Sequence, residues 1–226
     1  MMRKTQTPGA TMKPLFGLLL LAACLIAGDA QAQGAMPWRR IPNIAVVGPA
    51  DDPRLPMVDD AVAFWNMTFK ELGSPFHLGT VTHVGQPVPD KELQALSLAE
   101  VGHPGPFNAP PALRNRPGDI TVYLAASDFV SFATPFDPNG KRLVGIKGLS
   151  FPPLTLPNVA RNVVTHELGH TLGLGHNSDP AMLMCGRPAP CRPDAFRSDE
   201  PRMFPLTDAE RRQLASMYPP SWKPQR

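Results

Sequence analysis

Three histidines and one glutamate lie close together in the segment His166-Glu167-Leu168-Gly169-His170-Thr171-Leu172-Gly173-Leu174-Gly175-His176. On an α-helix, His166 and His170 are four residues apart, so both imidazoles leave the same face about one turn apart. That separation suits two nitrogen ligands of one tetrahedral zinc ion. Glu167 follows the first ligand directly, and at this H-E-x-x-H spacing its carboxylate can act as a general base on water beside the metal.

His176 decides whether a third ligand is available. It lies six residues after His170, so on a continued helix it would point about 240° away and lie about 9 Å further along the axis. The chain must therefore leave the helix between them, and Gly173 allows this because glycine readily adopts the left-handed conformation that ends a helix. Gly175 adds freedom before His176 returns to the metal. Three histidines leave a fourth position for water, which is typical of a catalytic zinc site.

The H-E-x-x-H-x-x-G-x-x-H string is similar to that of the metzincin metallopeptidases, which also carry a methionine turn beneath the metal. Downstream, residues 177–184 (Asn-Ser-Asp-Pro-Ala-Met-Leu-Met) resemble the matrixin version of that turn, as in secreted bacterial enzymes. Counting eight residues from His176 gives Met184 as the Met-turn residue, with Met182 as the second candidate. The resemblance covers the C-terminal third closely and the rest in outline.

This resemblance implies a zinc-dependent endopeptidase that cleaves extended peptides or proteins through a zinc-activated water. His166, His170 and His176 would hold one Zn²⁺, and Glu167 would be the general base. The implied fold is α+β: a twisted mixed β-sheet, a long helix, the zinc-bearing helix, and a smaller C-terminal lobe with the Met-turn and a final helix. Residues 33–226 would form this domain, with an upper lobe of about 37–176 and a lower lobe of about 177–220.

The first 32 residues predict a secretory signal peptide. Basic residues precede an apolar run from Leu15 to Ala27, and a small-x-small cleavage site follows at residues 30–32. The protein is therefore expected to be exported, to the periplasm or outside the cell. Residues 21–24 (Leu-Ala-Ala-Cys) support an alternative, because they look like the lipobox of bacterial lipoproteins, with Cys24 as the lipid anchor.

The net charge argues against a nucleic-acid partner, and the cysteine content predicts a disulfide. Residues 1–32 carry a net charge of +2 out of +3 for the whole chain, so the remainder is close to neutral and gives no electrostatic reason to bind nucleic acid. Cys185 and Cys191 are the remaining cysteines, and in an exported protein such a close pair predicts a disulfide. The resemblance to matrixins implies that this loop, with Pro188-Ala189-Pro190, lies where those enzymes build a wall of the substrate pocket.

Apolar periodicity and turn residues predict the positioning elements. Thr207 and Glu210 fit a capping box at the start of the last helix. Residues 143–151 are expected to be an edge strand to which an extended substrate adds. The other expected elements are strands at 44–47, 76–81 and 119–125, a long helix from Val58 to Leu72 that ends at Gly73, a short helix at 91–101, and the zinc helix with Val159, Ala160, Val163, Val164, Leu168 and Leu172 on its buried side.

Some matrixin features are missing. No histidine lies between His103 and His166, so no second zinc is expected. His77, His83 and His103 are predicted to be strand or loop residues rather than ligands. Asp137 and Asn139 could bind Ca²⁺, although an ordinary turn explains them better. No cysteine lies between residue 32 and the zinc motif to act as a latency switch, so the enzyme is expected to be constitutively competent or restrained by a separate protein inhibitor.

Two other functions fit parts of the pattern. One is a non-catalytic zinc-binding module of the same fold, although zinc binding alone does not need Glu167. The other is a zinc amidase that acts on cell-wall peptides or a small amide.

Mass spectrometry of the exported protein tests the prediction for the N-terminus. Signal cleavage after Ala32 predicts a mature chain that begins at Gln33, with no added lipid mass. A mature chain that begins at a lipidated Cys24 would contradict this prediction and support the lipoprotein alternative.

Overall fold

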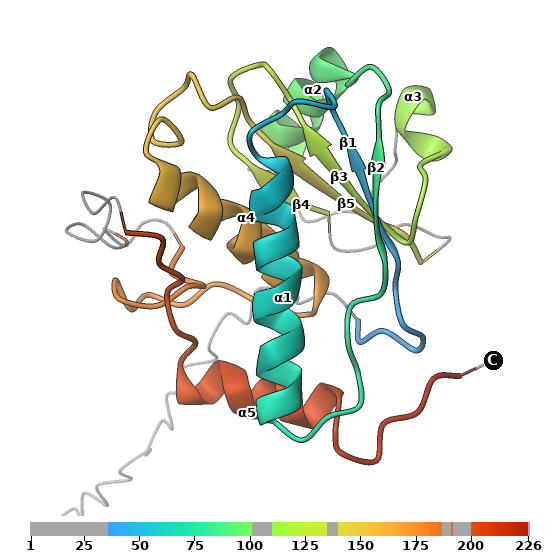
Figure 1. Ribbon diagram of the computed structural model, residues 1–226, viewed down its shortest axis with the longest axis vertical. Helices are drawn as coiled ribbons and strands as arrows, with labels where there is room; N and C mark the ends of the chain where they lie inside the picture. The colour runs from blue at the N-terminus through green and yellow to red at the C-terminus, as the bar shows by residue number, and fades with distance from the viewer. Residues whose placement is uncertain (1–35, 101–109, 135–139, 187–190, 192–199, 226) are drawn as a thin grey trace, which may run out of the picture. The chain divides into compact units, whose positions relative to one another are not determined.

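A computed structural model describes residues 36–100, 110–134, 140–186, 191 and 200–225 (Figure 1). The expected signal peptide with Cys24, the loop residue His103, the candidate calcium ligands Asp137 and Asn139, and the expected wall Pro188–Pro190 all lie outside the described residues. The described residues belong to one compact unit, Gln31–Arg226.

A five-stranded sheet forms the centre of that unit, in the order β2-β1-β3-β5-β4. The first four of these strands are parallel to one another, and β4 is antiparallel to β5 at the edge. The sheet is therefore mixed but mostly parallel. The strands are β1 Ile44–Val47, β2 Val81–Val84, β3 Ile120–Leu124, β4 Phe132–Ala133 and β5 Arg142–Ile146.

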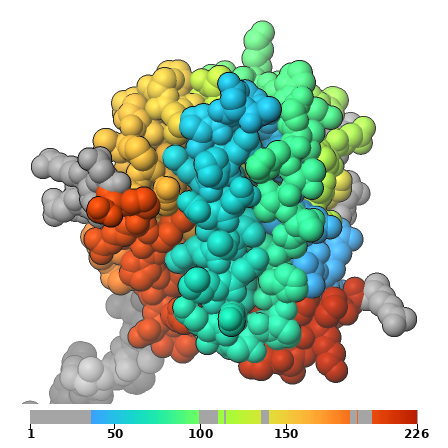
Figure 2. Space-filling model, in the orientation of Figure 1, coloured from blue at the N-terminus to red at the C-terminus, as the bar shows by residue number. Residues whose placement is uncertain are grey.

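Helices cover both faces of this sheet. The long helix α1 (Leu55–Glu71) and the histidine-bearing α4 (Pro157–Thr171) lie side by side on one face, and α5 (Asp208–Met217) crosses near the end of α1 (Figure 1). The side chains of α1 form a continuous band across the face seen in Figure 2. The other face carries α2 (Asp90–Glu100) and α3 (Pro111–Arg114). Among the described residues, no helix is both long and apolar enough to cross a bilayer.

The alternation of side chains along the strands divides the core between these two layers. Val122 and Val144 point toward α1 and α4 and join the larger apolar cluster. Their neighbours Tyr123 and Leu143 point toward α2 and α3 and join a second cluster. Because both faces of the central strands are buried, β1, β3 and β5 are mostly apolar, as is typical of parallel sheets, with Thr121 and Arg142 as buried exceptions.

Gly169 lets α4 approach α1 and the segment after α4. A Cβ atom at Gly169 would lie 2.7 Å from the Met184 sulfur and 2.8 Å from Cζ2 of Trp65, closer than side chains pack. The Trp65 ring cannot easily move away, because its Nε1 donates to the Thr165 carbonyl at 3.0 Å and the side chain is fully buried.

One expectation about the sheet is wrong. Residues 143–151 were predicted to be an edge strand because they contain glycines and a lysine, but β5 lies between β3 and β4. Gly145 suits this inner position, since a Cβ there would lie 2.7 Å from the Phe132 ring of β4. Lys147 follows β5 with its ammonium bonded to the Pro152 carbonyl at 2.6 Å and to Asp128 at 3.0 Å.

The strand expected at 76–81 is also misplaced, because β2 begins only at Val81. Phe76 is buried against Phe69 and Tyr218 instead of entering the sheet. The other expected elements are confirmed: β1, α1, α2, β3, α4, and α5 with its reciprocal Thr207–Glu210 capping box. Strand β4 and helix α3 were not predicted.

Replacing Gly169 with alanine tests the close packing of α4. We expect Gly169→Ala to lower the free energy of unfolding of the zinc-free protein by about 1–3 kcal/mol, because the added methyl overpacks against Trp65 and Met184. Urea denaturation measures the change. Gly85→Ala is the matched control, since a Cβ there meets no atom within 4 Å. An equal effect of both substitutions would contradict the packing argument.

Candidate metal centre

The three histidine rings converge on one point. The Nε2 atoms of His166 and His170 are 3.0 Å apart, and each lies 3.1 Å from Nε2 of His176. His166 is buried, His170 is half-buried and His176 is exposed. The cluster therefore has one side toward the core and one toward solvent, and it is the one set of three or more potential ligands found among the described residues.

In His166 and His170, hydrogen bonds to Nδ1, the ring nitrogen opposite the converging Nε2, determine which nitrogen carries the proton. Nδ1 of His166 is 2.8 Å from the Leu183 carbonyl oxygen, and Nδ1 of His170 is 2.8 Å from the Leu174 carbonyl oxygen. A carbonyl can only accept, so each Nδ1 carries the proton, and in a neutral ring Nε2 then has a lone pair. Burial lowers the pKa of His170 to about 4, with a further lowering from the nearby His176, so this ring is neutral at pH 7.

The facing lone pairs of His166 and His170 fit a cation. Without one, the two nitrogens 3.0 Å apart need a shared proton between them. A point to one side of the triangle of Nε2 atoms lies at the Zn–N distance of about 2.0–2.1 Å from all three. Backbone carbonyls bonded to the opposite ring nitrogen are the usual outer partners of zinc-bound histidines, because they set the tautomer and the ring orientation. The residues present therefore fit a zinc ion.

A short turn brings His176 back to the two helical histidines. Helix α4 ends at Thr171, and Gly173 has a φ of 101°, a left-handed conformation that glycine adopts without strain. The Leu174 amide closes the turn by donating to the Gly169 carbonyl at 3.2 Å. The predicted departure from the helix at Gly173 is confirmed.

A strand-like bridge then holds His176 from the other side. The amide of Asn177 donates to the Met184 carbonyl, and the Gly186 amide donates to the Asn177 carbonyl, both at 2.9 Å. The His176 ring lies directly on Gly186, where a Cβ would come within 2.3 Å of it. The predicted disulfide between Cys185 and Cys191 is present, with an S–S distance of 2.08 Å, and it follows this bridge directly.

Glu167 lies between the two helical histidines in sequence and is 7% exposed. Among the described residues, its carboxylate has no hydrogen-bond or ion-pair partner. Burial in these surroundings raises the pKa of Glu167 to about 8. A dication beside the carboxylate would favour its charged form and lower that pKa. A buried acid without a protein partner, one residue from a metal ligand, is suited to exchange protons with a molecule that enters the site.

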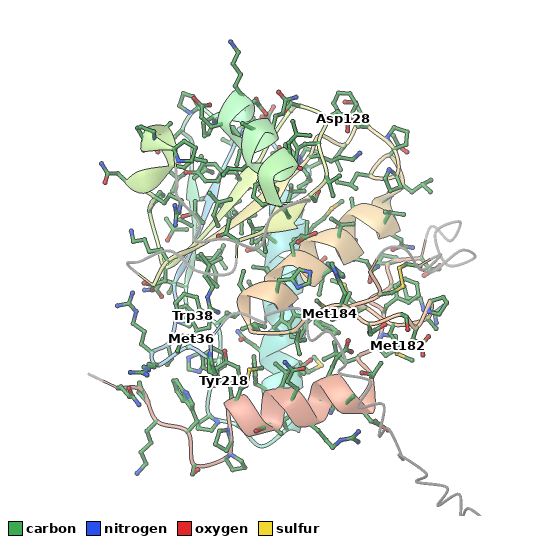
Figure 3. All side chains as sticks on the ribbon, turned by 180° about the vertical axis from the view of Figure 1, so that it is seen from behind. Met36, Trp38, Asp128, Met182, Met184 and Tyr218 are labelled. Carbon is green, nitrogen blue, oxygen red and sulfur yellow. A yellow bond between two sulfur atoms is a disulfide. The ribbon has the colours of Figure 1, made fainter. Side chains whose placement is uncertain are left out.

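Met184 is fully buried, and its sulfur faces the backbone of α4 at Gly169. Met182, the second candidate for the Met-turn, is only half-buried and lies further from α4 in Figure 3. His77 and His83 are exposed, and neither belongs to the cluster of three histidines. His83 lies in β2, whereas His77 precedes that strand. Sequence reasoning missed the roles of the Leu183 carbonyl and of Gly186. The glycine directly after Cys185 was the available signal for the second.

Comparison with known proteins gives no family for this chain. No family model matches it, and no curated protein matches it. Among solved structures, it is similar to the crystal structure of archaemetzincin from Methanopyrus kandleri, at 20% sequence identity and a TM-score of 0.40, over 79% of this chain and 96% of that one. A likeness at this identity and TM-score assigns no activity to this chain.

Zinc titration tests the site directly. We expect the chelator-treated protein to bind one equivalent of Zn²⁺, and zinc at about 100 times its Kd to stabilise the fold by roughly 2.7 kcal/mol. His176→Ala should weaken zinc binding by more than the 10–100-fold that loss of an outer partner typically causes. His83→Ala, an exposed histidine of β2, is the control. Equal zinc affinity in both variants would exclude His176 as a ligand.

Proposed function

We propose that this protein is a zinc-dependent endopeptidase of the metzincin type, with a matrixin-like arrangement of its site. The observation that carries the proposal is the convergence of three Nε2 atoms, two of them with their protons committed to carbonyls on the opposite side of the ring. Glu167, a buried carboxyl with no partner in the described part of the chain, adds the acid–base group that a purely structural zinc site does not need.

The residues divide the work of hydrolysis. When bound, zinc supplies Lewis acidity, which polarises a peptide carbonyl and makes water more acidic. Glu167 takes the proton from the attacking water and delivers it to the leaving amine. Each of the three histidines would coordinate the metal through Nε2 alone. The exposed side of His176 leaves the reacting centre open to substrate and solvent.

Substrate would bind along β4 rather than along the strand expected from the sequence. Helix α4 packs directly against β4 and β5, so the open edge of β4 is the sheet edge nearest the histidines. The Thr134 amide donates to the Leu143 carbonyl of β5 at 2.8 Å. Because bonding alternates along an antiparallel pair, the N–H and C=O of Ala133 point to the open edge. An extended peptide can pair with them by adding a strand.

The remaining features complete the proposal. Met184 would be the Met-turn residue, since it fills the space beneath Gly169. The Cys185–Cys191 disulfide is compatible with an exported protein. The proposed enzyme binds one zinc ion, folds as a domain of residues 33–226 with two lobes, and is exported under the direction of residues 1–32.

Replacing Glu167 with glutamine separates catalysis from zinc binding. We expect Glu167→Gln to bind one zinc ion and to lose about 10²–10⁴-fold in kcat/KM on a casein or mixed-peptide substrate, because the amide cannot accept the proton. Metal content and a generic protease assay measure the two effects. The exposed Glu71→Gln in α1 is the control. Zinc-loaded wild type that leaves proteins and peptide libraries uncut would overturn the proposal and favour a zinc-binding module or an amidase.

A further inference from the structure

The carbonyl groups at and after the end of α4 have two kinds of donor. A helix leaves its last four carbonyls without intrahelical partners, and water or short turns usually supply the donors. Here the Gly169 and His170 carbonyls accept from amides of the turn, whereas each of the next four carbonyls, from Thr171 to Leu174, accepts from a side chain. Those donors are Trp38 Nε1 to Thr171 at 2.8 Å, the Tyr218 hydroxyl to Leu172 at 3.1 Å, Gln213 Nε2 to Gly173 at 3.0 Å, and His170 Nδ1 to Leu174 at 2.8 Å.

Three of these donors come from parts of the chain far from α4. Trp38 belongs to the first described segment, Gln213 lies on α5, and Tyr218 is the residue after α5. Figure 3 shows Trp38 and Tyr218 close together near the end of α4. The Tyr218 hydroxyl connects them, because it accepts from the Trp38 amide at 3.1 Å while it donates to Leu172. The two ends of the described chain therefore meet at the turn between the second and third histidines.

The Trp38 side chain is itself held firmly. It is 6% exposed, and the Arg142 guanidinium stacks over its ring at 4.0 Å. Burial lowers the pKa of Arg142 to about 10, and its Nε and Nη1 atoms have no hydrogen-bond partner among the described residues. The Trp222 indole donates to the Trp38 carbonyl at 3.2 Å. Trp38 is thus a fixed donor rather than a mobile surface ring.

The turn needs such donors because its sequence is flexible. His166 and His170 are placed by the regular geometry of the helix. The position of His176 depends on every backbone dihedral from Thr171 to Gly175, and two of these five residues are glycines. Ordering a residue costs about 1–2 kcal/mol in conformational entropy. A turn that is ordered before metal arrives does not pay this cost on binding, so its ligand binds more tightly.

We propose that Trp38, Tyr218 and Gln213 are positioning residues for the third histidine, and that they raise zinc affinity by ordering the turn from Thr171 to Leu174. This inference rests on the zinc site proposed above. None of the three side chains is a metal ligand; each acts through a backbone carbonyl of the turn. Removing one donor leaves a carbonyl without its partner and lets the turn sample positions in which His176 is out of reach.

Conservative variants with matched controls test this role. Trp38→Phe removes one donor and keeps an aromatic ring. Tyr218→Phe also keeps its ring, but it removes both the donor to Leu172 and the acceptor of the Trp38 amide. Tyr123→Phe is their control, because it removes the hydroxyl of a buried tyrosine on the opposite face of the sheet, in the core cluster against α2 and α3. Gln213→Ala removes the third donor from an exposed position of α5, where the fold tolerates truncation, and the neighbouring exposed Arg212→Ala is its control.

Zinc affinity is measured by competition with a chromophoric chelator, at a temperature where circular dichroism shows each variant folded. We expect the zinc Kd to rise about tenfold in Trp38→Phe and Tyr218→Phe, at the low end of the loss for outer partners, and about threefold in Gln213→Ala. Both controls should stay within twofold of wild type. A purely structural role would lower the melting temperature of the metal-free protein without changing the Kd of the folded form.

The inference fails if Gln213→Ala and whichever aromatic variants fold bind zinc as tightly as their controls. That result, with normal zinc binding by the wild type, leaves the zinc site intact and removes only the positioning role. Wild type that binds no zinc would overturn both the positioning role and the proposed function.

Discussion

The Nε2 atoms of His166 and His170 face each other at 3.0 Å, a separation that requires either a shared proton or a metal ion between them. The structure holds them there: the helix sets the spacing of His166 and His170, and a carbonyl bonded to each Nδ1 fixes the ring and its proton. The fold thus orients both rings toward one point where a metal ion can bind. Such an arrangement is expected where binding is coupled to a preformed site, because the ligand set must be neutral and oriented before the ion arrives.

Three parts of the molecule hold the histidines in this arrangement: the packing of α4, the turn after α4, and the bridge between Asn177 and Cys185. The sheet and α1 fix α4, and Gly169 lets that packing be close. The turn after α4 returns His176, with its carbonyls bonded by side chains from α5 and from both ends of the described chain. The bridge between Asn177 and Cys185 then sets Gly186 beneath the His176 ring. The strand order places the edge of β4 beside α4, so a single arrangement positions the metal ligands and a possible substrate edge together.

Local patterns could be predicted from the sequence, and long-range partners could not. The spacing of His166 and His170, the helix end at Gly173 and the Thr207–Glu210 cap each depend on residues within a few positions of one another. The place of β5 in the sheet does not. Its Gly145 and the following Lys147 suggested an exposed edge, but the glycine accommodates the Phe132 ring of a two-residue strand that leaves almost no periodic signal. Trp38 and Tyr218 show no sequence pattern that links them to residues 171 and 172, because only the folded chain brings them together.

The coordination of zinc in the purified protein tests the central claim most directly. X-ray absorption at the zinc edge, on protein loaded with one equivalent of metal, reports the number and type of neighbouring atoms. Three imidazole nitrogens at about 2.0–2.1 Å and one oxygen from solvent are the result that this account predicts. A sulfur neighbour, fewer than three imidazoles, or a fourth protein ligand that closes the site would contradict it.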